Sequence, residues 1–473
     1  MTLPDIDPTK IQTLQEAQTA ILKLLNFIEE LFKDREQLIA KVQQLEEELD
    51  KFRRQSKKPQ LWKGKPVTEY SPTKMIKQRK ERSGKMAKQI PIDRYENLPE
   101  TTVCSCGSDE FVLIRTWNKL VQGLIIRRDN VLYHGKDKKC RLCGKIHHST
   151  LPPGASGHQF SSELKSWLSV FKYDCRMSEL VIGRFLSGLG VEISTGHINK
   201  IILENSHALA AGYTHLKVWG LKLSSYLHSD ATGLTRQIMS TGKRIHQHLH
   251  FAGHKYLSLF KITSRYNSLL LGAKVLGKRA MEHIYISDDG SPNGENLPVK
   301  RKQLCWIHEI RHFLKLWPKI KIHRQELEEV IDRLWRFYQS AKDYGRDPTP
   351  EKKISLGKLF DEIIGTQITY EELAKRLRLT GRKKNRLLLF LDYPGIPIEN
   401  NLAERDLRPA VIIRKLSGGT KSEAGNRSFE RHMSIIQTAH KQNLNIFDTL
   451  HGLINGTLDP FILTRKTLPV FTS

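Results

Sequence analysis

The hydrophobic residues near the N-terminus recur at alternating spacings of three and four. From Leu14 they fill both apolar positions of six consecutive heptads, and Arg35 alone interrupts the stripe. Such a stripe is buried best against a second helix, and one polar position can fix the register of the pair. The pattern predicts a coiled coil over 8–55 that joins subunits into a homo-oligomer, although an amphipathic helix packed on its own chain would look the same. The stripe consists of Leu14, Ala17, Ile21, Leu24, Ile28, Leu31, Arg35, Leu38, Val42, Leu45, Leu49 and Phe52.

Helical patterns return after residue 156. Ser178 has the position of an N-cap, Gly188 to Gly190 end a helix, and Ser194 opens the next one. A helix, a glycine turn and a second helix predict a helix-turn-helix-like DNA-binding region, although a plain helical hairpin shares the pattern. The second helix would offer DNA the side chains of Thr195, His197, Asn199 and Lys200.

In the middle of the chain, the spacing of hydrophobic residues changes from a helical period to an alternation of apolar and polar residues. Three strand-like runs follow one another from about residue 222, and a helical run at 268–283 leads to a short strand that ends at Asp288. A further apolar run at 303–307 enters a helix. Three antiparallel strands followed by alternating helix and strand predict a ribonuclease-H-like α/β domain, into which the mostly helical, charged residues 318–395 are inserted.

The composition indicates what kind of partner the protein binds. The 473 residues include 77 Lys and Arg against 50 Asp and Glu, a formal charge of +27, which favours nucleic acid as the partner. The basic residues 56–95 lack an apolar period, and they are typical of a linker that lies along phosphates or of a solvated tether. Because no apolar run approaches about 18 residues and only six cysteines occur, we expect a cytoplasmic protein of a reducing compartment without a membrane partner.

Four of the cysteines form two close pairs. Cys104 and Cys106 precede Cys140 and Cys143, and paired thiolates at this spacing favour a structural Zn²⁺ in a small zinc-finger-like module. His134, His147 or His148 could replace a sulfur ligand, and reduced cysteines that merely cluster are the alternative. Cys175 and Cys305 are expected to be unliganded.

Carboxylates are spaced as a metal site requires. Asp230 lies within the first strand and Asp288 at the end of the fourth, and neighbouring strands would bring them together. Converging carboxylates repel unless cations lie between them, and Mg²⁺ prefers such oxygens, so the pattern predicts two ions. A third acid, Glu404, lies on the first turn of a helix that Asn400 or Asn401 would cap. Alone, Glu404 would be read as a solvated charge paired with Arg408.

Other residues near these acids invite a supporting role. Cys305 is expected at a strand end, with His308 near the active site, and Trp306 and Trp317 are expected in the core. Asp406 faces another side of its helix and is the weaker metal ligand. Basic residues beside Glu404 and around the following glycines are predicted to bind phosphates. They are Arg405, Arg408, Arg414, Lys415 and Lys421, with Arg427 close by.

The run from Ile398 to Asn443, beginning IENNLAERDLRP, resembles the C-terminal signature of the IS66 family of insertion-sequence transposases. The zipper-like N-terminus, the cysteine pairs, the strand with Asp230 and the Cys305–His308 element follow in that family's order. The resemblance implies a DDE triad of Asp230, Asp288 and Glu404. Two departures stand out, because Ala231-Thr232 replaces the usual Glu-Thr and Asp288-Asp289-Gly290 replaces Asp-Gly-Tyr, so Asp289 is an alternative second acid.

What the resemblance implies is a bacterial, nucleoid-associated enzyme. It would bind the terminal inverted repeats of an insertion sequence and catalyse DNA cleavage and strand transfer with Mg²⁺ or Mn²⁺. Accessory proteins of the same element are a further candidate for a partner. The main alternative is a catalytically inactive or domesticated DNA-binding protein derived from such an enzyme, and a nuclease or resolvase of the same fold is the third.

Together these patterns predict a multidomain α+β protein. Its ranges are a coiled-coil helix at 8–55, a basic linker at 56–95, a zinc-binding module at 96–155, a helix-turn-helix-like region at 156–215, a catalytic domain at 216–317 and 396–450, a helical insertion at 318–395 and a tail at 451–473.

Overall fold

The computed structural model describes residues 13–52, 126–152, 159–220, 224–238, 242–264, 283–289 and 301–466, together with isolated positions before residue 120. Residues 34–125 form one unit, and residues 1–33 with 126–473 form the other. The predicted helix at 268–283 and the thiols Cys104 and Cys106 lie outside the described residues.

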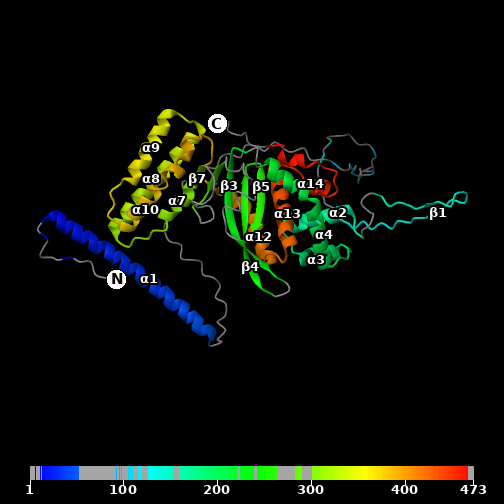
Figure 1. Cartoon of the computed structure of the whole chain (residues 1–473), viewed down its shortest axis with the longest axis horizontal. Helices are drawn as coiled ribbons and strands as arrows, with labels where there is room; N and C mark the ends of the chain where they lie inside the picture. The colour runs from blue at the N-terminus through cyan, green and yellow to red at the C-terminus, as the bar shows by residue number, and fades with distance from the viewer. Residues whose placement is uncertain are drawn as a thin grey trace. The chain divides into compact units, whose positions relative to one another are not determined.

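A five-stranded mixed sheet lies at the centre of the larger unit (Figure 1). Its order is β5-β4-β3-β6-β7, in which the first three strands are antiparallel and the last two run parallel to β3. The three consecutive antiparallel strands and the parallel fourth strand agree with the alternation in the sequence, and the α+β class is confirmed. The strands are β3 (Tyr226–Gln237), β4 (Arg244–His254), β5 (Leu257–Thr263), β6 (Ile284–Ser287) and β7 (Arg301–Leu304).

Two long C-terminal helices cover this sheet. Helix α12 (Asn401–Ser417) packs on β3 and β4, and α13 (Glu423–Gln442) packs on β5 (Figure 1). Phe251 and Phe260 are cross-strand partners and both are fully buried, so β4 and β5 contribute an aromatic pair to this core. The core therefore holds α12, which carries Glu404, against the strand that carries Asp230.

Short helices before the sheet extend the same core. Ser161, Ser178 and Ser194 cap three of them by accepting a backbone N–H three residues on, as the sequence predicts for the last two. Gly190 ends the turn between two helices with φ of +78°. The elements are α2 (Ser162–Ser169), η2 (Val170–Asp174), α3 (Glu179–Gly188), α4 (Thr195–Ala208), α5 (Ala210–His215) and η3 (Leu216–Gly220), joined after α13 by α14 (Ile446–Ile454) and η8 (Pro460–Thr464).

The residues between β7 and α12 build a second, helical core. Trp306 is fully buried there, with the rings of Phe337 and Phe360 around it. Trp317, expected in the core, is instead 55% exposed, and Lys319 lies 5.8 Å from its ring centre. The elements are α7 (Trp306–Phe313), α8 (Lys321–Arg346), α9 (Pro350–Ile364), α10 (Glu371–Gly381), α11 (Lys384–Leu387) and η7 (Leu389–Leu391).

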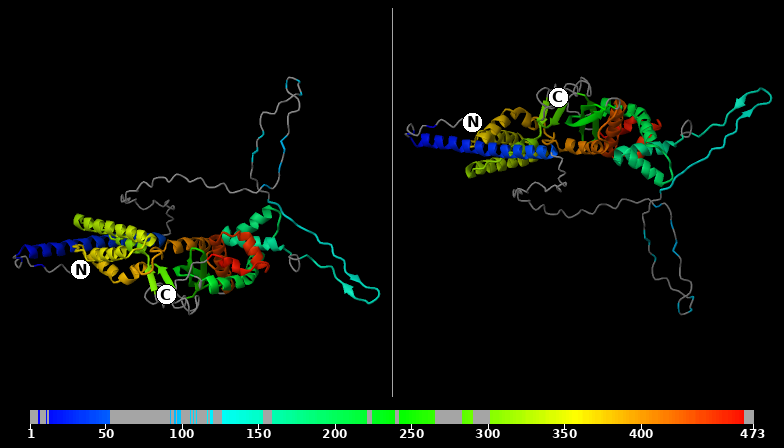
Figure 2. Two further views of the ribbon diagram at one scale, coloured as in Figure 1. Left: turned by 90° about the horizontal axis from the view of Figure 1, so that it is seen from above. Right: turned by 90° about the horizontal axis from the view of Figure 1, so that it is seen from below.

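The N-terminal helix α1 (Leu14–Phe52) is continuous over 39 residues. Within residues 14–33, which belong to the larger unit, Asn26 and Glu29 are hydrogen-bonded to the insertion, whose yellow helices lie next to this part of the blue ribbon in Figure 2. Two antiparallel strands of two residues each, β1 (Lys138–Lys139) and β2 (Ile146–His147), form a hairpin, and the second cysteine pair lies between them in the sequence. Among the described helices, none is both long and apolar enough to cross a membrane.

Candidate active site

Asp230 and Asp288 come from adjacent parallel strands. In the register of β3 and β6, His228 lies opposite Ile286. Two residues further along each strand are Asp230 and Asp288, the latter immediately after β6 ends. Since neighbouring strands are about 5 Å apart, the pairing brings the two backbones together at one edge of the sheet. The predicted convergence of these two acids follows directly from the strand order.

Glu404 reaches the same neighbourhood from the first turn of α12. Its carboxylate is 38% exposed, and its Oε1 atom accepts a hydrogen bond from Arg311 Nη1 at 3.1 Å. His308 Nε2 lies 3.2 Å from the same oxygen. Both partners stand on α7, so Glu404 is held across helices and not by Arg408 on its own helix. His308 thus lies beside the candidate third acid, where the sequence predicted it.

Asp230 is buried, and the charges of Asp288 and Glu404 act on it. Burial, reinforced by the carboxylates of Asp288 and Glu404, raises the pKa of Asp230 to about 7, although its carboxylate accepts the Ala231 N–H at 2.7 Å. A carboxyl group that is half protonated near neutral pH is poised to gain from a nearby cation. Perturbation by burial together with like charges is typical of functional sites.

Asp289, the alternative second acid, has a different partner. Lys383 Nζ lies 2.5 Å from its Oδ2 atom, and the same ammonium lies 3.2 Å from the buried carboxylate of Glu309. Arg376 and Thr380 complete the shell of Glu309. Asp289 is therefore paired with a cation of the insertion, whereas Asp288 directly follows β6 and its charge acts on the buried Asp230.

Asn400 ties the elements of the site together. The sequence suggested that Asn400 or Asn401 would cap a helix beginning at Leu402, but α12 begins at Asn401, and Asn400 makes no capping bond with its side chain. Its Oδ1 lies 3.0 Å from His228 Nδ1, and its Nδ2 donates to the Ser229 carbonyl at 3.0 Å. The start of α12 is thereby fixed to β3, two residues from Asp230.

Cys305 fixes the same junction from the other side. Its Sγ accepts the Asn400 N–H at 3.2 Å, and the Trp306 N–H donates to the Ile398 carbonyl at 2.9 Å. Cys305 is 2% exposed at the end of β7, as expected from the sequence. The thiol therefore aligns the helix that bears His308 with the helix that bears Glu404.

The other acid of α12, Asp406, is buried away from this site. Its Oδ2 forms an ion pair with Lys441 and accepts from Ser258 Oγ at 3.2 Å. Burial lowers the pKa of Lys441 to about 8, and the adjacent Asp406 opposes that change. These contacts give Asp406 a structural role in the core. They fit the interpretation that Asp406 is a weaker candidate than Glu404 for a metal ligand.

The predicted phosphate-binding residues divide into two groups. Arg405, Arg408, Lys415 and Lys421 are exposed. Arg414 is partly buried, and its Nη1 donates to Thr232 Oγ1 at 3.0 Å and to the Gly233 carbonyl. The exposed group is available to a polyanion, while the Arg414 guanidinium already joins α12 to the strand of Asp230.

The glycines after α12 serve close packing. Gly418 ends the helix in the left-handed conformation, with φ of +67°. A Cβ on Gly419 would stand 1.9 Å from the Thr235 carbonyl oxygen, so only glycine fits there. Thr420 donates to that carbonyl at 3.1 Å, which pins the loop to β3.

On α4, the predicted recognition residues lie mostly on the surface. Thr195, Asn199 and Lys200 are exposed. His197 is partly buried, and its ring packs edge-on against Phe160 at 5.2 Å. The first three can contact a ligand as they stand, whereas His197 contributes to packing.

The second cysteine pair lies in a tight turn. Gly144 donates its N–H to the Cys140 carbonyl at 3.0 Å with φ of +71°, and Cys140 donates to the Lys145 carbonyl at 2.8 Å. The N–H groups of Cys143 and Leu142 lower the pKa of the Cys140 thiol. Stabilised thiolates suit a metal, and this half of the predicted zinc site has the right donor chemistry.

Across the described parts of the chain, no three His, Cys, Asp or Glu side chains are grouped tightly enough to hold a metal ion as they stand. The chemical type of Asp230, Asp288 and Glu404 nevertheless suits a hard divalent cation, because all three offer carboxylate oxygens. The raised pKa of Asp230 is the observation that favours a cation there.

Three residues of this neighbourhood have roles that were not anticipated from the sequence: Arg311, Lys383 and Asn400. Arg311 follows His308 by three residues, a spacing that puts both on one helix face, so that pair could have been found. Lys383 offers no local signal, because its partners are 74 and 94 positions away. Asn400 looked like a cap and acts as a cross-link.

Comparison with known proteins defines the class. The profile of the transposase IS66 family matches residues 157–428, more than half of the chain and a range that includes all three acids. The chain belongs to the IS66 family of transposases. An uncharacterized protein of Sinorhizobium fredii, y4jO, is 34% identical over 167 residues, and a second one, y4qI, is 25% identical over 158. These matches cover 35% and 31% of this chain and only 51% and 29% of the two relatives.

Proposed function

We propose that the protein is a DNA transposase that cleaves and joins the ends of an insertion sequence through a DDE triad of Asp230, Asp288 and Glu404. The observation that carries the proposal is the convergence of three carboxylates, contributed by β3, the end of β6 and α12: burial, reinforced by the charges of Asp288 and Glu404, raises the pKa of Asp230 to about 7. The sheet order, antiparallel β5-β4-β3 followed by parallel β6 and β7, supports a ribonuclease-H-like catalytic domain.

In the proposed reaction, water attacks a phosphodiester at the element end and releases a 3′-hydroxyl, which then attacks target DNA. Each step forms one P–O bond and breaks another, so no covalent protein intermediate is needed. The three carboxylates would hold Mg²⁺ or Mn²⁺, and such ions activate the attacking oxygen and stabilise the leaving one.

The protein's own groups would orient these carboxylates. Arg311 and His308 fix Glu404 from α7, while Asn400 sets the distance between β3 and α12. Lys383 neutralises Asp289 so that it does not add a fourth repelling charge. Oriented ligands raise metal affinity because less rearrangement is needed on binding.

DNA would lie over the exposed basic residues of α12 and the loop behind it. Arg405 and Arg408 follow Glu404 within one helical turn, and Lys415 and Lys421 come later in the sequence. Helix α4 would read the terminal repeats through Thr195, Asn199 and Lys200. Contacts to phosphates make such binding strongly salt-dependent.

Two further modules belong to the proposal. Cys140 and Cys143, with Cys104 and Cys106, would bind a structural Zn²⁺, and zinc measured per chain should fall when Cys143 is changed to Ser. The stripe of α1 would pair subunits so that two DNA ends are processed together.

The test is strand transfer by the full chain on end-repeat DNA with Mg²⁺. Glu404→Gln is expected to lower the rate by at least about a hundredfold, because one charged ligand is lost while size is kept. Asp343→Asn is the matched control, since Asp343 is exposed and pairs with Arg346 on its own helix. Equal rates for wild type and Glu404→Gln would refute the triad.

The alternative is a DNA-binding protein that has lost catalysis. Its specific support is that Glu404 is already paired with Arg311 and His308, and that Ala231 follows Asp230 where the family usually has Glu. Such a protein would bind end-repeat DNA normally, and neither wild type nor variant would transfer strands with Mg²⁺ or Mn²⁺.

A further inference from the structure

Two helices of the insertion begin without a side-chain cap of their own. Ile320 precedes α8 and Tyr370 precedes α10, and neither side chain can accept a backbone N–H in the manner of a capping residue. Amides at helix starts lack partners within the helix, so another segment must supply acceptors if they are to be satisfied away from water.

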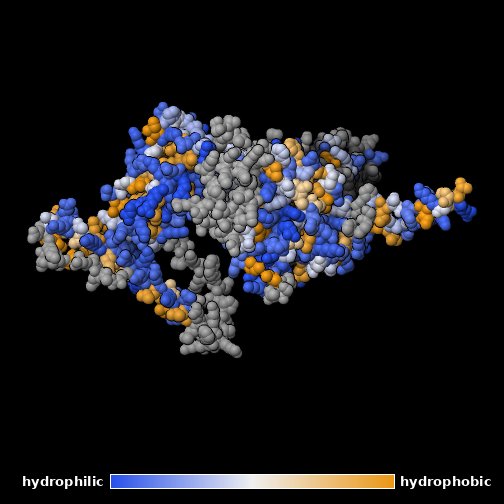
Figure 3. All heavy atoms as spheres, in the orientation of Figure 1, coloured by the Kyte–Doolittle hydropathy of each residue, from blue (hydrophilic) through white to orange (hydrophobic). Residues whose placement is uncertain are grey.

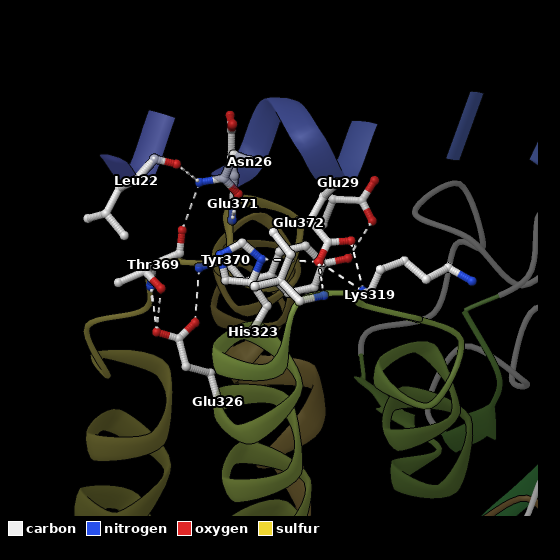
Figure 4. Close-up of polar contacts among 11 residues, drawn as sticks. Leu22, Asn26, Glu29, Lys319, His323, Glu326, Thr369, Tyr370, Glu371 and Glu372 are labelled. Atoms are coloured by element: carbon white, nitrogen blue, oxygen red, sulfur yellow. Dashed lines mark hydrogen bonds and ion pairs between the residues drawn. The ribbon is translucent and has the colours of Figure 1, made fainter. Parts of the chain in front are cut away.

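Helix α1 supplies one of these acceptors. The carboxylate of Glu29 accepts the Lys319 N–H at 2.9 and 3.0 Å and the Ile320 N–H at 2.7 Å (Figure 4). His323 Nδ1 lies 3.3 Å from the same carboxylate. Glu29 is only 9% exposed, and a negative charge at the start of a helix is favoured by the helix dipole.

A second side chain of α1 serves α10. Asn26 donates to the Thr369 carbonyl and accepts the Glu371 N–H, each at 3.0 Å (Figure 4). From α8, Glu326 accepts the N–H groups of Thr369 and Tyr370, also at 3.0 Å. The starts of α8 and α10 and one side of α1 are therefore joined by one polar contact region, here called the polar seat, in which Asn26, Glu29 and Glu326 supply the acceptors.

The seat uses a different side of α1 from the heptad stripe. Leu22, Asn26, Glu29 and Lys33 are spaced by four, three and four residues, which places them on one helix face. The stripe remains exposed, and its apolar atoms are orange along α1 at the lower left of Figure 3. Exposed fractions are 78% for Leu14, 55% for Ile21, 44% for Leu24, 39% for Ile28, 47% for Leu31, 64% for Leu38, 54% for Val42 and 56% for Leu45.

We propose that α1 is a two-faced coupling helix: its polar face is fixed to the insertion of its own chain, and its apolar face pairs with α1 of a second copy. Pairing of two chains would then position the two insertions and not merely tether them. This inference deepens the self-association proposed above and rests on it.

The second copy is the occupant that the helix itself favours. The stripe keeps a 3.5-residue period over six heptads, which is the period at which a helix fits another of its own kind. Helix α1 carries nine acidic and five basic side chains in a chain of net charge +27. A net acidic helix repels DNA, so its apolar face suits a protein helix.

The test uses the full chain and two kinds of variant. Glu29→Ala removes the acceptor of the seat, with Glu30→Ala, an exposed neighbour, as its control. Leu24→Asp with Leu31→Asp charges the exposed stripe. The readouts are the molar mass by light scattering and hydrogen exchange of a peptide that contains Lys319 and Ile320.

We expect wild type to self-associate with slow exchange at these amides. Glu29→Ala should keep the mass and accelerate exchange at least about tenfold relative to Glu30→Ala, because local opening sets the rate. The stripe variant should become monomeric and keep slow exchange. A monomeric wild type, an associated stripe variant, or unchanged exchange in Glu29→Ala would each overturn the proposal.

Fast exchange in a monomeric stripe variant would also overturn it, since the seat would then be filled by the second copy's helix. Neither readout uses DNA or metal. Failure of strand transfer would therefore count against the transposase proposal and leave the coupling helix standing.

Discussion

The two sides of helix α12 hold carboxylates in different surroundings. Asp406 is 8% exposed as a side chain, and on the core side it forms an ion pair with Lys441 and accepts a hydrogen bond from Ser258. Two residues earlier, Glu404 points to the neighbourhood of Asp230 and Asp288, whose negative charges act together. A buried charge with a close partner is a part of the scaffold, whereas a buried carboxylate with further carboxylates near it, as at Asp230, indicates a site that suits a cation.

The contrast teaches how one helix can serve both purposes. Positions i and i+2 face different sides of a helix, so Glu404 and Asp406 cannot share partners. The scaffold side holds the first turns of α12 in place, and the opposite side presents Glu404, a partly exposed acid that Arg311 and His308 orient from α7. The predictions below test this division, from the largest expected effect to the smallest.

Asp406→Asn should lower the free energy of unfolding by roughly 3 kcal/mol, because it leaves the Lys441 ammonium buried without its counter-charge. Denaturant unfolding at pH 7 measures the change. Asp392→Asn, which breaks an exposed pair with Lys353, is the control and should cost less than about 1 kcal/mol. Glu404→Gln should resemble this control in stability. If Asp406→Asn were as stable as wild type, the scaffold role of this acid would be wrong.

Asp230→Asn should behave in the opposite way and stabilise the metal-free protein at pH 8. The pKa of Asp230 is raised to about 7 in the fold, so the folded state binds the proton more tightly than the unfolded chain and wild type loses stability as pH rises from about 4 to 7. The variant avoids this loss, and its advantage should reach roughly 1 to 3 kcal/mol at pH 8 and vanish below about pH 4. Parallel stability curves for the two proteins across this range would contradict the electrostatic coupling.

Lys383→Ala should reduce strand transfer by about tenfold at limiting Mg²⁺, with a smaller effect at saturating Mg²⁺, because Asp289 would regain an uncompensated charge beside Asp288. Lys384→Ala is a neighbouring control, since Lys384 pairs with Asp361 on the surface. Rates are measured across a Mg²⁺ titration. An equal loss in both variants would point to a general effect of surface charge.

Much of the central fold could be predicted from local pattern. Alternation marked the strands because one strand face meets the core, and the N-caps Ser178 and Ser194 mark their helices because the bond to the backbone lies within one turn. The proximity of Asp230 and Asp288 followed from strand order. These features depend on neighbours in the sequence or in the sheet.

The features that could not be predicted depend on contacts between segments that are distant in the sequence. Asn400 was expected to cap a helix, but its amide instead bridges β3 and α12, 171 positions away. Glu29 was read only through its place in a heptad, while its partner amides lie about 290 positions away. Trp317 is apolar enough for a core, yet no element covers it within the described residues. Sequence periodicity carries no information on such pairs.

Cys305→Ser should have the smallest effect, about 1 kcal/mol or less in stability and no more than about twofold in strand transfer. The serine hydroxyl can accept the Asn400 N–H that Cys305 Sγ accepts at 3.2 Å, so the junction between β7 and α12 should survive. Metal content per chain is measured beside activity, with the exposed Cys175→Ser as control. If Cys305 and His308 instead formed half of a metal site, this variant alone would lose bound metal and activity together, and the division between scaffold and site along α12 would have to be redrawn around the thiol.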